Sequence, residues 1–218
     1  MDNFAKSGDG KGKETGRIEA FSDGVFAIAI TLLVLNLKVP VAENVPAGMG
    51  LWGYLLGQWP IFLAYLASFC TILIMWVNHH HVFNLIKRSD DIFMYFNGLL
   101  LLFISFLPFP TSLLAEHIQH GYASTAMAIY SGTLVVIAIF FNLLWRYASH
   151  ANRLLDKNAD PVFVKGVTRQ YSFGPPMYLL AFIIAFIDVA TSIAICFGLA
   201  IFFALISLLS KRVFGSSD

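Results

Sequence analysis

The chain has 218 residues, of which 58% are hydrophobic and only 12% are charged, about half the ~25% charged share of an ordinary soluble domain. A soluble fold of this length has too little interior to bury so much apolar surface, whereas a bilayer solvates that surface. The net charge of +1 excludes the strongly basic composition that would favour nucleic acid as a partner. The composition therefore predicts an all-α integral membrane protein whose surroundings are the lipid bilayer.

The N-terminal third begins with a polar segment and continues into a long apolar one. Residues 1–16 are rich in Gly, Lys and Ser and offer little to bury, so we expect a mobile tail. The apolar run over residues 21–37 follows without a small-residue cleavage site, which favours a retained first transmembrane helix over a signal peptide.

Three more apolar runs follow, over residues 51–77, 92–114 and 124–147. The first two contain Pro60 and Pro108, and in a membrane such prolines predict kinks more than breaks because neighbouring helices re-satisfy the freed carbonyls. A polar stretch that we interpret as a loop extends from residue 146 to residue 173.

The last apolar run, residues 174–209, is interrupted only by Asp188. It is too long for one span of about 20 residues, and it fits two spans with a tight turn near Asp188. The prediction is therefore six transmembrane helices per subunit, within a domain over residues 17–212 that is followed by a short tail over residues 213–218.

The distribution of cations supports this count. With six spans, Lys38 alone lies on one side of the membrane, and the other thirteen of the 14 lysines and arginines lie on the side of the termini. Cations accumulate on the cytoplasmic side of membrane proteins. We therefore expect both termini in the cytoplasm of a multi-pass protein of the plasma membrane.

The start of the first predicted helix is unusually polar. Arg17, Glu19, Ser22 and Asp23 lie at or just inside the membrane boundary, where an ionisable residue is costly and suggests a functional site. Arg17 and Asp23 are about 120° apart around a helix axis, so they do not pair along one face. Each therefore needs a partner on another helix, and the plainest interpretation is a polar anchor that fixes helix packing.

The same helix carries an apolar stripe further along. Ile28, Leu32 and Leu35 share one face at spacings of four and seven residues, with Thr31 beside them. Spacing alone predicts no more than packing against a neighbour.

The second predicted helix ends in a cluster around three histidines. Consecutive residues on a helix point in three directions, so His79, His80 and His81 do not converge on one metal, and no HExxH motif accompanies them. One of them is expected to hydrogen-bond inside the bundle, and which one stays open. Asn97 of the third run needs a partner if it faces the interior, and a network with Arg17, Asp23, Trp76 and a histidine would supply one.

The segment from Arg17 to Leu35, with its R-x-x-x-F-S-D core, closely resembles the signature of the transmembrane protein 175 family of non-canonical potassium channels. Trp76 and His79 at the end of the second span, and Asn97 and Pro108 in the third, extend the resemblance over most of the chain. Animal members carry two six-helix repeats and this chain carries one. The resemblance therefore implies a homotetramer of the prokaryotic kind, with the first helix of each subunit lining a central pore.

The resemblance also implies roles for individual residues. The narrowest ring of the pore falls on Ile28, with Leu32 and Leu35 further along and Thr31 as a hydroxyl layer. The resemblance further implies that Arg17, Ser22 and Asp23 bond to the second and third helices in a structural network. Our candidates for the other side of that network are Trp76, His79 and Asn97.

The leading functional hypothesis is a potassium-permeable channel whose constriction is made of aliphatic side chains rather than backbone carbonyls. No enzyme activity, cofactor or bound metal is predicted, and K⁺ is the permeant ion. The first alternative is a proton- or ion-coupled transporter that uses Asp23 and a histidine of the second span. The second alternative is a membrane enzyme that uses the histidine cluster.

Overall fold

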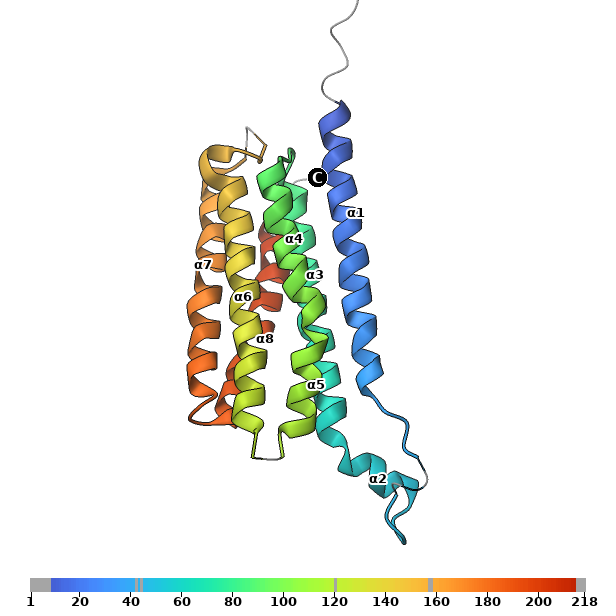
Figure 1. Cartoon of the computed structure of the whole chain (residues 1–218). Helices are drawn as coiled ribbons and strands as arrows, with labels where there is room; N and C mark the ends of the chain where they lie inside the picture. The colour runs from blue at the N-terminus through green and yellow to red at the C-terminus, as the bar shows by residue number, and fades with distance from the viewer. Residues whose placement is uncertain (1–8, 42, 44, 120, 157–158, 215–218) are drawn as a thin grey trace, which may run out of the picture.

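The computed structural model describes residues 9–41, 43, 45–119, 121–156 and 159–214 (Figure 1). All of the regular structure in these residues is helical. The elements in chain order are α1 (Asp9–Leu32), the 3-10 helix η1 (Leu33–Asn36), α2 (Leu51–Gly57), α3 (Trp59–Leu85), α4 (Asp91–Phe106), α5 (Pro108–His117), α6 (Ala123–Ser149), the 3-10 turn η3 (His150–Asn152), α7 (Pro161–Ile184) and α8 (Val189–Phe214).

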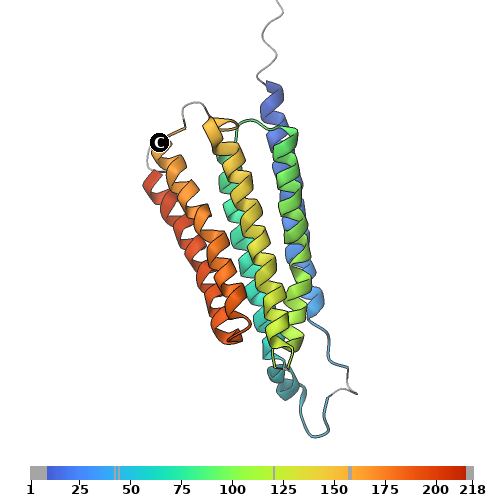
Figure 2. The same ribbon diagram turned by 60° about the vertical axis from the view of Figure 1, so that its left-hand side comes forward.

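The long helices form a bundle with two distinct edges (Figures 1 and 2). Helix α1 lies at one edge and packs against α3 and α4, whereas α7 lies at the other edge and packs against α6 and α8. The apolar core lies between them, and its largest fully buried side chains include Trp145, Phe93 and Leu100. The short helix α2 lies at the far end, beside the start of α3.

Among the described residues, five helical segments are long and apolar enough to cross a membrane: Thr15–Asn36, Trp59–Leu85, Asp91–His117, Ala123–Asn152 and Val189–Ile206. Helix α7 runs beside α6 and α8 but does not join this group, because Lys165, Arg169 and a Pro175–Pro176 pair lower its apolar content. The composition of these segments therefore identifies a multi-pass membrane protein. Helix α7 is a proposed sixth span.

The two prolines of the predicted second and third spans act differently. Pro60 lies in the first turn of α3, so the run over residues 51–77 is divided into α2 and α3 and is not one kinked helix as predicted. Proline fits the first helical turn because its missing N–H has no partner there. Pro108 begins α5 directly after α4, and Leu107 between them keeps right-handed helical angles, so the third span continues across this proline.

The boundaries of three polar segments also differ from the predicted ones. Helix α1 begins at Asp9, within the predicted tail, while residues 1–8 lie outside the described part of the chain. The predicted loop over residues 146–173 is mostly helical, since α6 continues to Ser149 and α7 begins at Pro161. Helix α8 extends through Phe214, so of the predicted C-terminal tail only residues 215–218 lie beyond it, outside the description.

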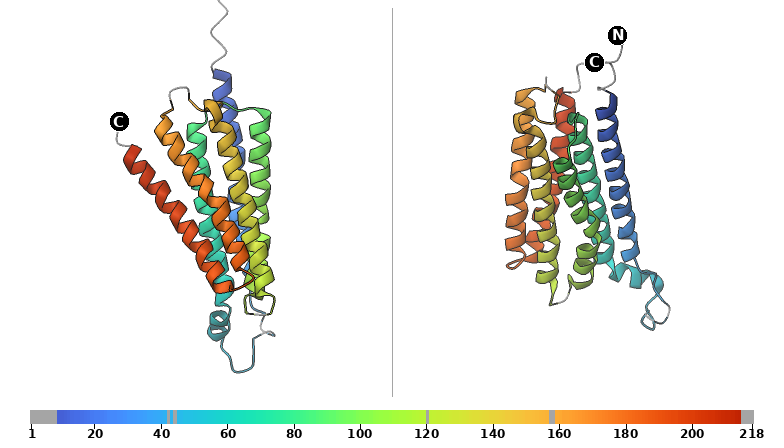
Figure 3. Two further views of the ribbon diagram at one scale, coloured as in Figure 1. Left: turned by 90° about the vertical axis from the view of Figure 1, so that its left-hand side faces the viewer. Right: turned by 45° about the horizontal axis from the view of Figure 1, so that its top comes forward.

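The turn predicted near Asp188 lies between Ile184 and Val189. Asp188 fixes the start of α8, because its Oδ2 accepts a 2.8 Å hydrogen bond from the Thr191 backbone N–H. Hydrogen bonds from Thr191 also lower the pKa of Asp188. As a result of this turn, the start of α1 and the end of α8 lie at the same end of the bundle (Figure 3).

The loops at that end are tied together by Asp90, which precedes α4. Its carboxylate accepts hydrogen bonds from the Phe93 backbone N–H (2.9 Å) and the Tyr147 hydroxyl (2.8 Å), and it lies 3.4 Å from Nε of Arg153. Partial burial raises the pKa of Asp90, but these three partners outweigh it and lower the pKa overall. The α3–α4 and α6–α7 connections are thus joined across the end of the bundle.

Candidate functional site

Helix α1 has one buried and one exposed face. Ser22, Phe26, Ala29 and Leu33 are at most 1% exposed and face α3 and α4. On the opposite face, Phe21, Ile28 and Leu35 recur every seven residues and are 65%, 59% and 70% exposed.

All four residues that the family resemblance assigns to the pore lie on the exposed side. Leu32 is 39% exposed, and Thr31 is exposed with its hydroxyl donating a 2.9 Å hydrogen bond to the Ile28 carbonyl. A single subunit therefore presents an uncovered, largely apolar stripe from Phe21 in α1 to Leu35 in η1. Such a stripe marks a surface that meets something other than the rest of its own chain.

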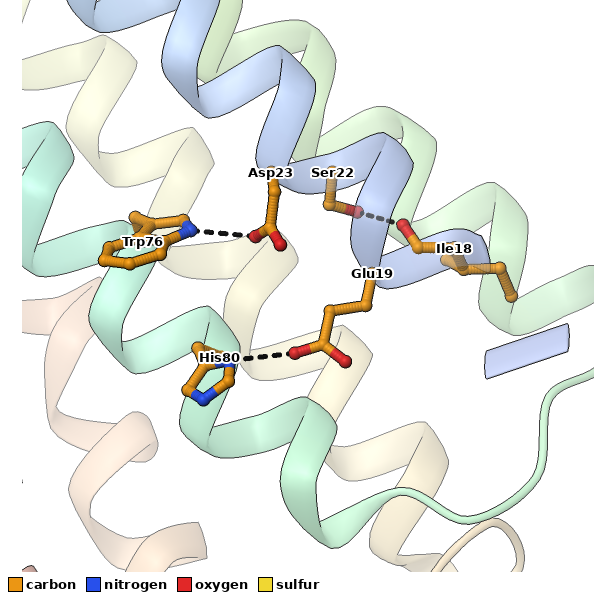
Figure 4. Close-up of polar contacts among 6 residues, drawn as sticks. All are labelled: Ile18, Glu19, Ser22, Asp23, Trp76 and His80. Carbon is orange, nitrogen blue, oxygen red and sulfur yellow. Dashed lines mark hydrogen bonds and ion pairs between the residues drawn. The ribbon is translucent and has the colours of Figure 1, made fainter. Parts of the chain in front are cut away.

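Two side-chain pairs connect α1 to α3 (Figure 4). The indole Nε1–H of Trp76 donates a 2.8 Å hydrogen bond to Oδ1 of Asp23, and Nδ1 of His80 lies 2.8 Å from Oε1 of Glu19. Each helix contributes residues four positions apart, so the two pairs stack one helical turn from each other along antiparallel helices.

A buried chain of hydrogen bonds connects α1 to α4 and α3. The Ser22 hydroxyl donates to the Ile18 carbonyl (2.8 Å), so it accepts the 2.9 Å hydrogen bond from Nδ2 of Asn97. Because the amide nitrogen of Asn97 is the donor there, its Oδ1 is the acceptor for Nε2 of His79, at 2.9 Å. The direction of donation is therefore fixed along this row of hydrogen bonds: His79 donates to Asn97, Asn97 to Ser22, and Ser22 to the α1 backbone.

This order determines the tautomer of His79. Its Nε2 carries the proton that Asn97 Oδ1 accepts, so the neutral ring presents Nδ1 as an acceptor. Nδ1 is buried and has no hydrogen-bond partner among the described residues. The ring lies against Phe83, with centroids 4.3 Å apart, and against Phe26 at 5.3 Å, so aromatic packing holds it in place.

The structure thus brings together Ser22, Asp23, Trp76, His79 and Asn97, and it does not bring Arg17 into their network. Arg17 is exposed near the start of the span Thr15–Asn36, in line with Phe21 and Ile28. The histidine cluster does not assemble a metal centre either, since no group of three or more potential ligands lies together among the described residues.

The far end of α1 has a second, smaller set of contacts. The Ser112 hydroxyl of α5 donates to Oδ1 of Asn36, and the Asn36 amide lies 3.5 Å from the Pro108 carbonyl. Lys38 pairs with Glu116 at 3.8 Å, with both side chains more than two thirds exposed. Helix α1 and η1 are therefore attached at two places. Ser22 and Asp23 hold the start of the span Thr15–Asn36 through buried and half-buried groups, and Asn36 and Lys38 hold the far end through half-buried and exposed ones.

Sequence reasoning missed the pair formed by His80 and Glu19, although it singled out both segments. The signal was present in the spacing. Glu19 precedes Asp23 by four residues and His80 follows Trp76 by four, so on antiparallel helices one pair implies the other. Two of the three histidines thus bond to other helices, His80 to Glu19 of α1 and His79 to Asn97 of α4.

The comparisons with known proteins agree with this geometry. A family model described as the endosomal/lysosomal potassium channel TMEM175 matches residues 17–108, the region that contains every member of the network. A protein of Chamaesiphon minutus, named a potassium channel, is 56% identical over 88% of this chain and 94% of its own. The chain belongs to the TMEM175 family.

Two further relatives extend the comparison within the TMEM175 family. A protein of Streptomyces collinus, also named a potassium channel, is 42% identical over 83% of this chain and 87% of its own. The crystal structure of a Chamaesiphon minutus homologue, described as a lysosomal potassium-selective channel TMEM175 homolog, superposes with a TM-score of 0.82. That comparison has 52% sequence identity and covers 89% of this chain and 98% of the other. The bundle described above is therefore the fold of this family.

Proposed function

We propose that this member of the TMEM175 family is a potassium-permeable channel that works as a homotetramer, with α1 of each subunit around a central pore. The observation that supports the proposal most directly is the division of α1 into two faces. One face is fixed to α3 and α4 by buried hydrogen bonds, and the other offers an uninterrupted exposed stripe from Phe21 to Leu35.

The relatives support a channel and give no support to the two alternatives. The Chamaesiphon minutus and Streptomyces collinus proteins are named potassium channels, and neither name describes a transporter or an enzyme. The buried contacts of Asp23 and His79 fit a packing role, since each is engaged by another side chain of the same subunit.

In the proposed tetramer, four Ile28 side chains form the narrowest ring, and Leu32 and Leu35 continue it with Thr31 between them. A narrow aliphatic ring excludes water and gates by dewetting, and it conducts when α1 shifts so that the ring widens. The backbone carbonyls in the interior of α1, that of Ile28 among them, are hydrogen-bonded within the helix and are not free to replace the hydration shell of an ion. Selection then depends on the cost of dehydration, which is lower for K⁺ than for Na⁺, so the preference for potassium should be modest.

We also propose that both termini lie in the cytoplasm and that α7 is a sixth span. The cation count of the sequence supports this topology, as does the position of the two chain ends at one end of the bundle (Figure 3). A prokaryotic plasma membrane is the proposed location.

The test is the reversal potential of the purified protein in a planar bilayer, with K⁺ on one side and Na⁺ on the other. Unitary currents that reverse toward the potassium equilibrium potential are expected. The variant Ile28→Asn places a polar amide in the ring, and we expect larger unitary currents and a reversal potential closer to zero.

Ile183→Asn is the matched control, because Ile183 is 51% exposed but lies on α7, at the edge of the bundle opposite α1. It should leave both quantities unchanged. Equal behaviour of the two variants would remove Ile28 from the constriction. Flux that appears only under a proton gradient, without unitary currents, would overturn the channel itself.

A further inference from the structure

Three exposed cations lie on α6 and α7 toward the end of the bundle where α1 begins: Arg146, Lys165 and Arg169. We propose that this basic patch binds the phosphate of an anionic phospholipid in the leaflet that surrounds it. The contact of this patch with lipid rests on the proposed tetramer, in which α6 and α7 are peripheral, but not on which ion the channel conducts.

Ser172 holds the Arg146 side chain in position. Nη2 of Arg146 donates a 2.9 Å hydrogen bond to Oγ of Ser172, whose own hydroxyl donates to the Thr168 carbonyl at 2.7 Å. A guanidinium has five N–H donors, and the bond to Ser172 uses one. The others face no acceptor within the described part of the chain, so they are available for the fork-shaped, two-point contact that arginine makes with phosphate.

The geometry of α7 places the other two cations on the same side of the bundle as that guanidinium, with Lys165 about 10 Å along the helix from Ser172. Lys165, Arg169 and Ser172 follow one another at spacings of four and three residues, so they share one face of α7. Because Ser172 contacts Arg146 directly, this face lies along α6, and the three charges share one surface.

Asp160, the acid that precedes the patch on α7, is engaged at the helix start. Its carboxylate accepts the backbone N–H of Val162 at 2.9 Å, five residues before Lys165 along the chain.

The depth of the patch matches a lipid headgroup. Arg146 lies about 35 Å along the helix from Ala123, at 1.5 Å per residue, which is slightly more than the ~30 Å thickness of a hydrocarbon core. Phe173, next to Ser172 on α7, is 47% exposed, so an apolar side chain lies on the membrane side of Lys165 and Arg169, where acyl chains would be. Juxtamembrane cations at this depth attract anionic lipids.

The position in the bundle leaves this surface open to the bilayer. Helix α7 lies at the edge opposite α1 (Figures 1 and 3). In a tetramer with α1 at its centre, α6 and α7 are therefore on the periphery, where lipid and not another subunit is the neighbour.

The experiment is native mass spectrometry of the purified full-length protein, titrated with phosphatidylglycerol or with phosphatidylcholine. The wild type should retain phosphatidylglycerol in preference to phosphatidylcholine. Arg146→Gln and Arg169→Gln should each weaken phosphatidylglycerol binding about fivefold, which corresponds to the ~1 kcal/mol that one cation near a membrane surface contributes. Arg146→Lys keeps the charge and should recover part of the loss.

Lys87→Gln is the matched control, because Lys87 is an exposed cation of the α3–α4 connection at the same end of the bundle. It should bind phosphatidylglycerol as the wild type does. Inorganic phosphate at the same concentrations should not displace the lipid, since it lacks acyl chains that contact Phe173. If Lys87→Gln loses as much binding as Arg146→Gln, or if the wild type does not distinguish the two lipids, the patch is not a site and the proposal is wrong. Displacement by inorganic phosphate would reassign the site to a free anion.

Discussion

The two edges of the bundle are held by different interactions. Between α6 and α7, aromatic side chains form the contact: Trp145 is fully buried, Phe141 and Tyr171 stack with ring centroids 6.0 Å apart, and Trp145 lies 6.2 Å from Tyr171. Nε1 of Trp145 also donates to the Thr168 hydroxyl at 2.8 Å. Apolar contacts of this kind tolerate small displacements, but their loss is expensive because large rings leave large cavities.

At the other edge, α1 and η1 bury a narrow stripe of three apolar residues and depend on directional hydrogen bonds that Ser22, Asp23 and Glu19 accept. A directional bond is lost over a fraction of an ångström, and each contributes only about 1–3 kcal/mol. Helices α6 and α7 therefore suit a fixed scaffold, whereas α1 can change position by exchanging a few hydrogen bonds. An element that gates a pore needs that property.

The largest effect is expected from removing the centre of the scaffold. Trp145→Ala deletes a fully buried ring and its hydrogen bond, and such truncations cost about 3–5 kcal/mol. The midpoint of thermal unfolding, measured on the purified protein in detergent, should fall accordingly. Phe173→Ala on the same pair of helices is the control, because its 47% exposed ring should change the midpoint little. Similar midpoints for the two variants would mean that the α6–α7 contact is not the stable edge.

A smaller effect is expected from Asn97→Leu, which breaks the buried chain that holds α1. The substitution leaves the Nε2–H of His79 without an acceptor, and an unsatisfied buried donor costs about 1–3 kcal/mol. We expect a moderate fall in the unfolding midpoint together with a changed open probability of the channel, since α1 loses its tie to α4.

Asn84→Leu makes the same replacement at an exposed position of α3 and should alter neither property. A stable Asn97→Leu variant with unchanged gating would show that the hydrogen bonds of Asn97 do not control the position of α1 at the pore.

The sequence predicted most of the helices because long apolar runs are a strong signal in a membrane protein. It failed where a helix is only partly apolar. Residues 161–173 were interpreted as loop because Lys165 and Arg169 interrupt the apolar run, yet Asp160 and Pro161 form a cap and a first turn typical of a helix start. Thr168 and Tyr171 of this segment pack on Trp145 of α6, and the exposed cations Lys165 and Arg169 lie beside that face. A search for continuous apolar runs overlooks that pattern.

Partners of the polar residues were harder to predict than their existence. Burial cost alone required that Asp23 and Asn97 find partners on other helices, but it did not say which ones. Which histidine reaches Asn97 of α4 and which reaches Glu19 of α1 depends on the rotation of α3 about its axis. Packing across the whole bundle sets that rotation. The exposed stripe of α1 was visible as a repeat, and its lack of a partner within the subunit became visible only with the fold.

The smallest effects compare the two ends of α1, and they use two double-mutant cycles. The Asp23–Trp76 pair joins a carboxylate to a half-buried indole at 2.8 Å, for which a coupling of about 1.5–3 kcal/mol is expected. The Lys38–Glu116 pair is exposed and 3.8 Å apart, and such pairs contribute less than about 1 kcal/mol and weaken in salt. Asp23→Ala, Trp76→Phe and the double variant form one cycle, and Lys38→Ala with Glu116→Ala forms the other, with unfolding free energies measured at low and high salt.

A larger coupling at Asp23 would mean that α1 is held mainly at the end where it begins, so that the stripe near Leu35 moves farthest when the helix tilts. In that case the gate should be sensitive to substitutions of Asn36 and Ser112, which hold the far end through a single hydroxyl contact. Equal couplings would place no preferred pivot at either end, and a widening of the ring at Ile28 would then require a translation or rotation of α1 as a whole. The two cycles therefore distinguish between a tilting and a sliding helix before any open structure is known.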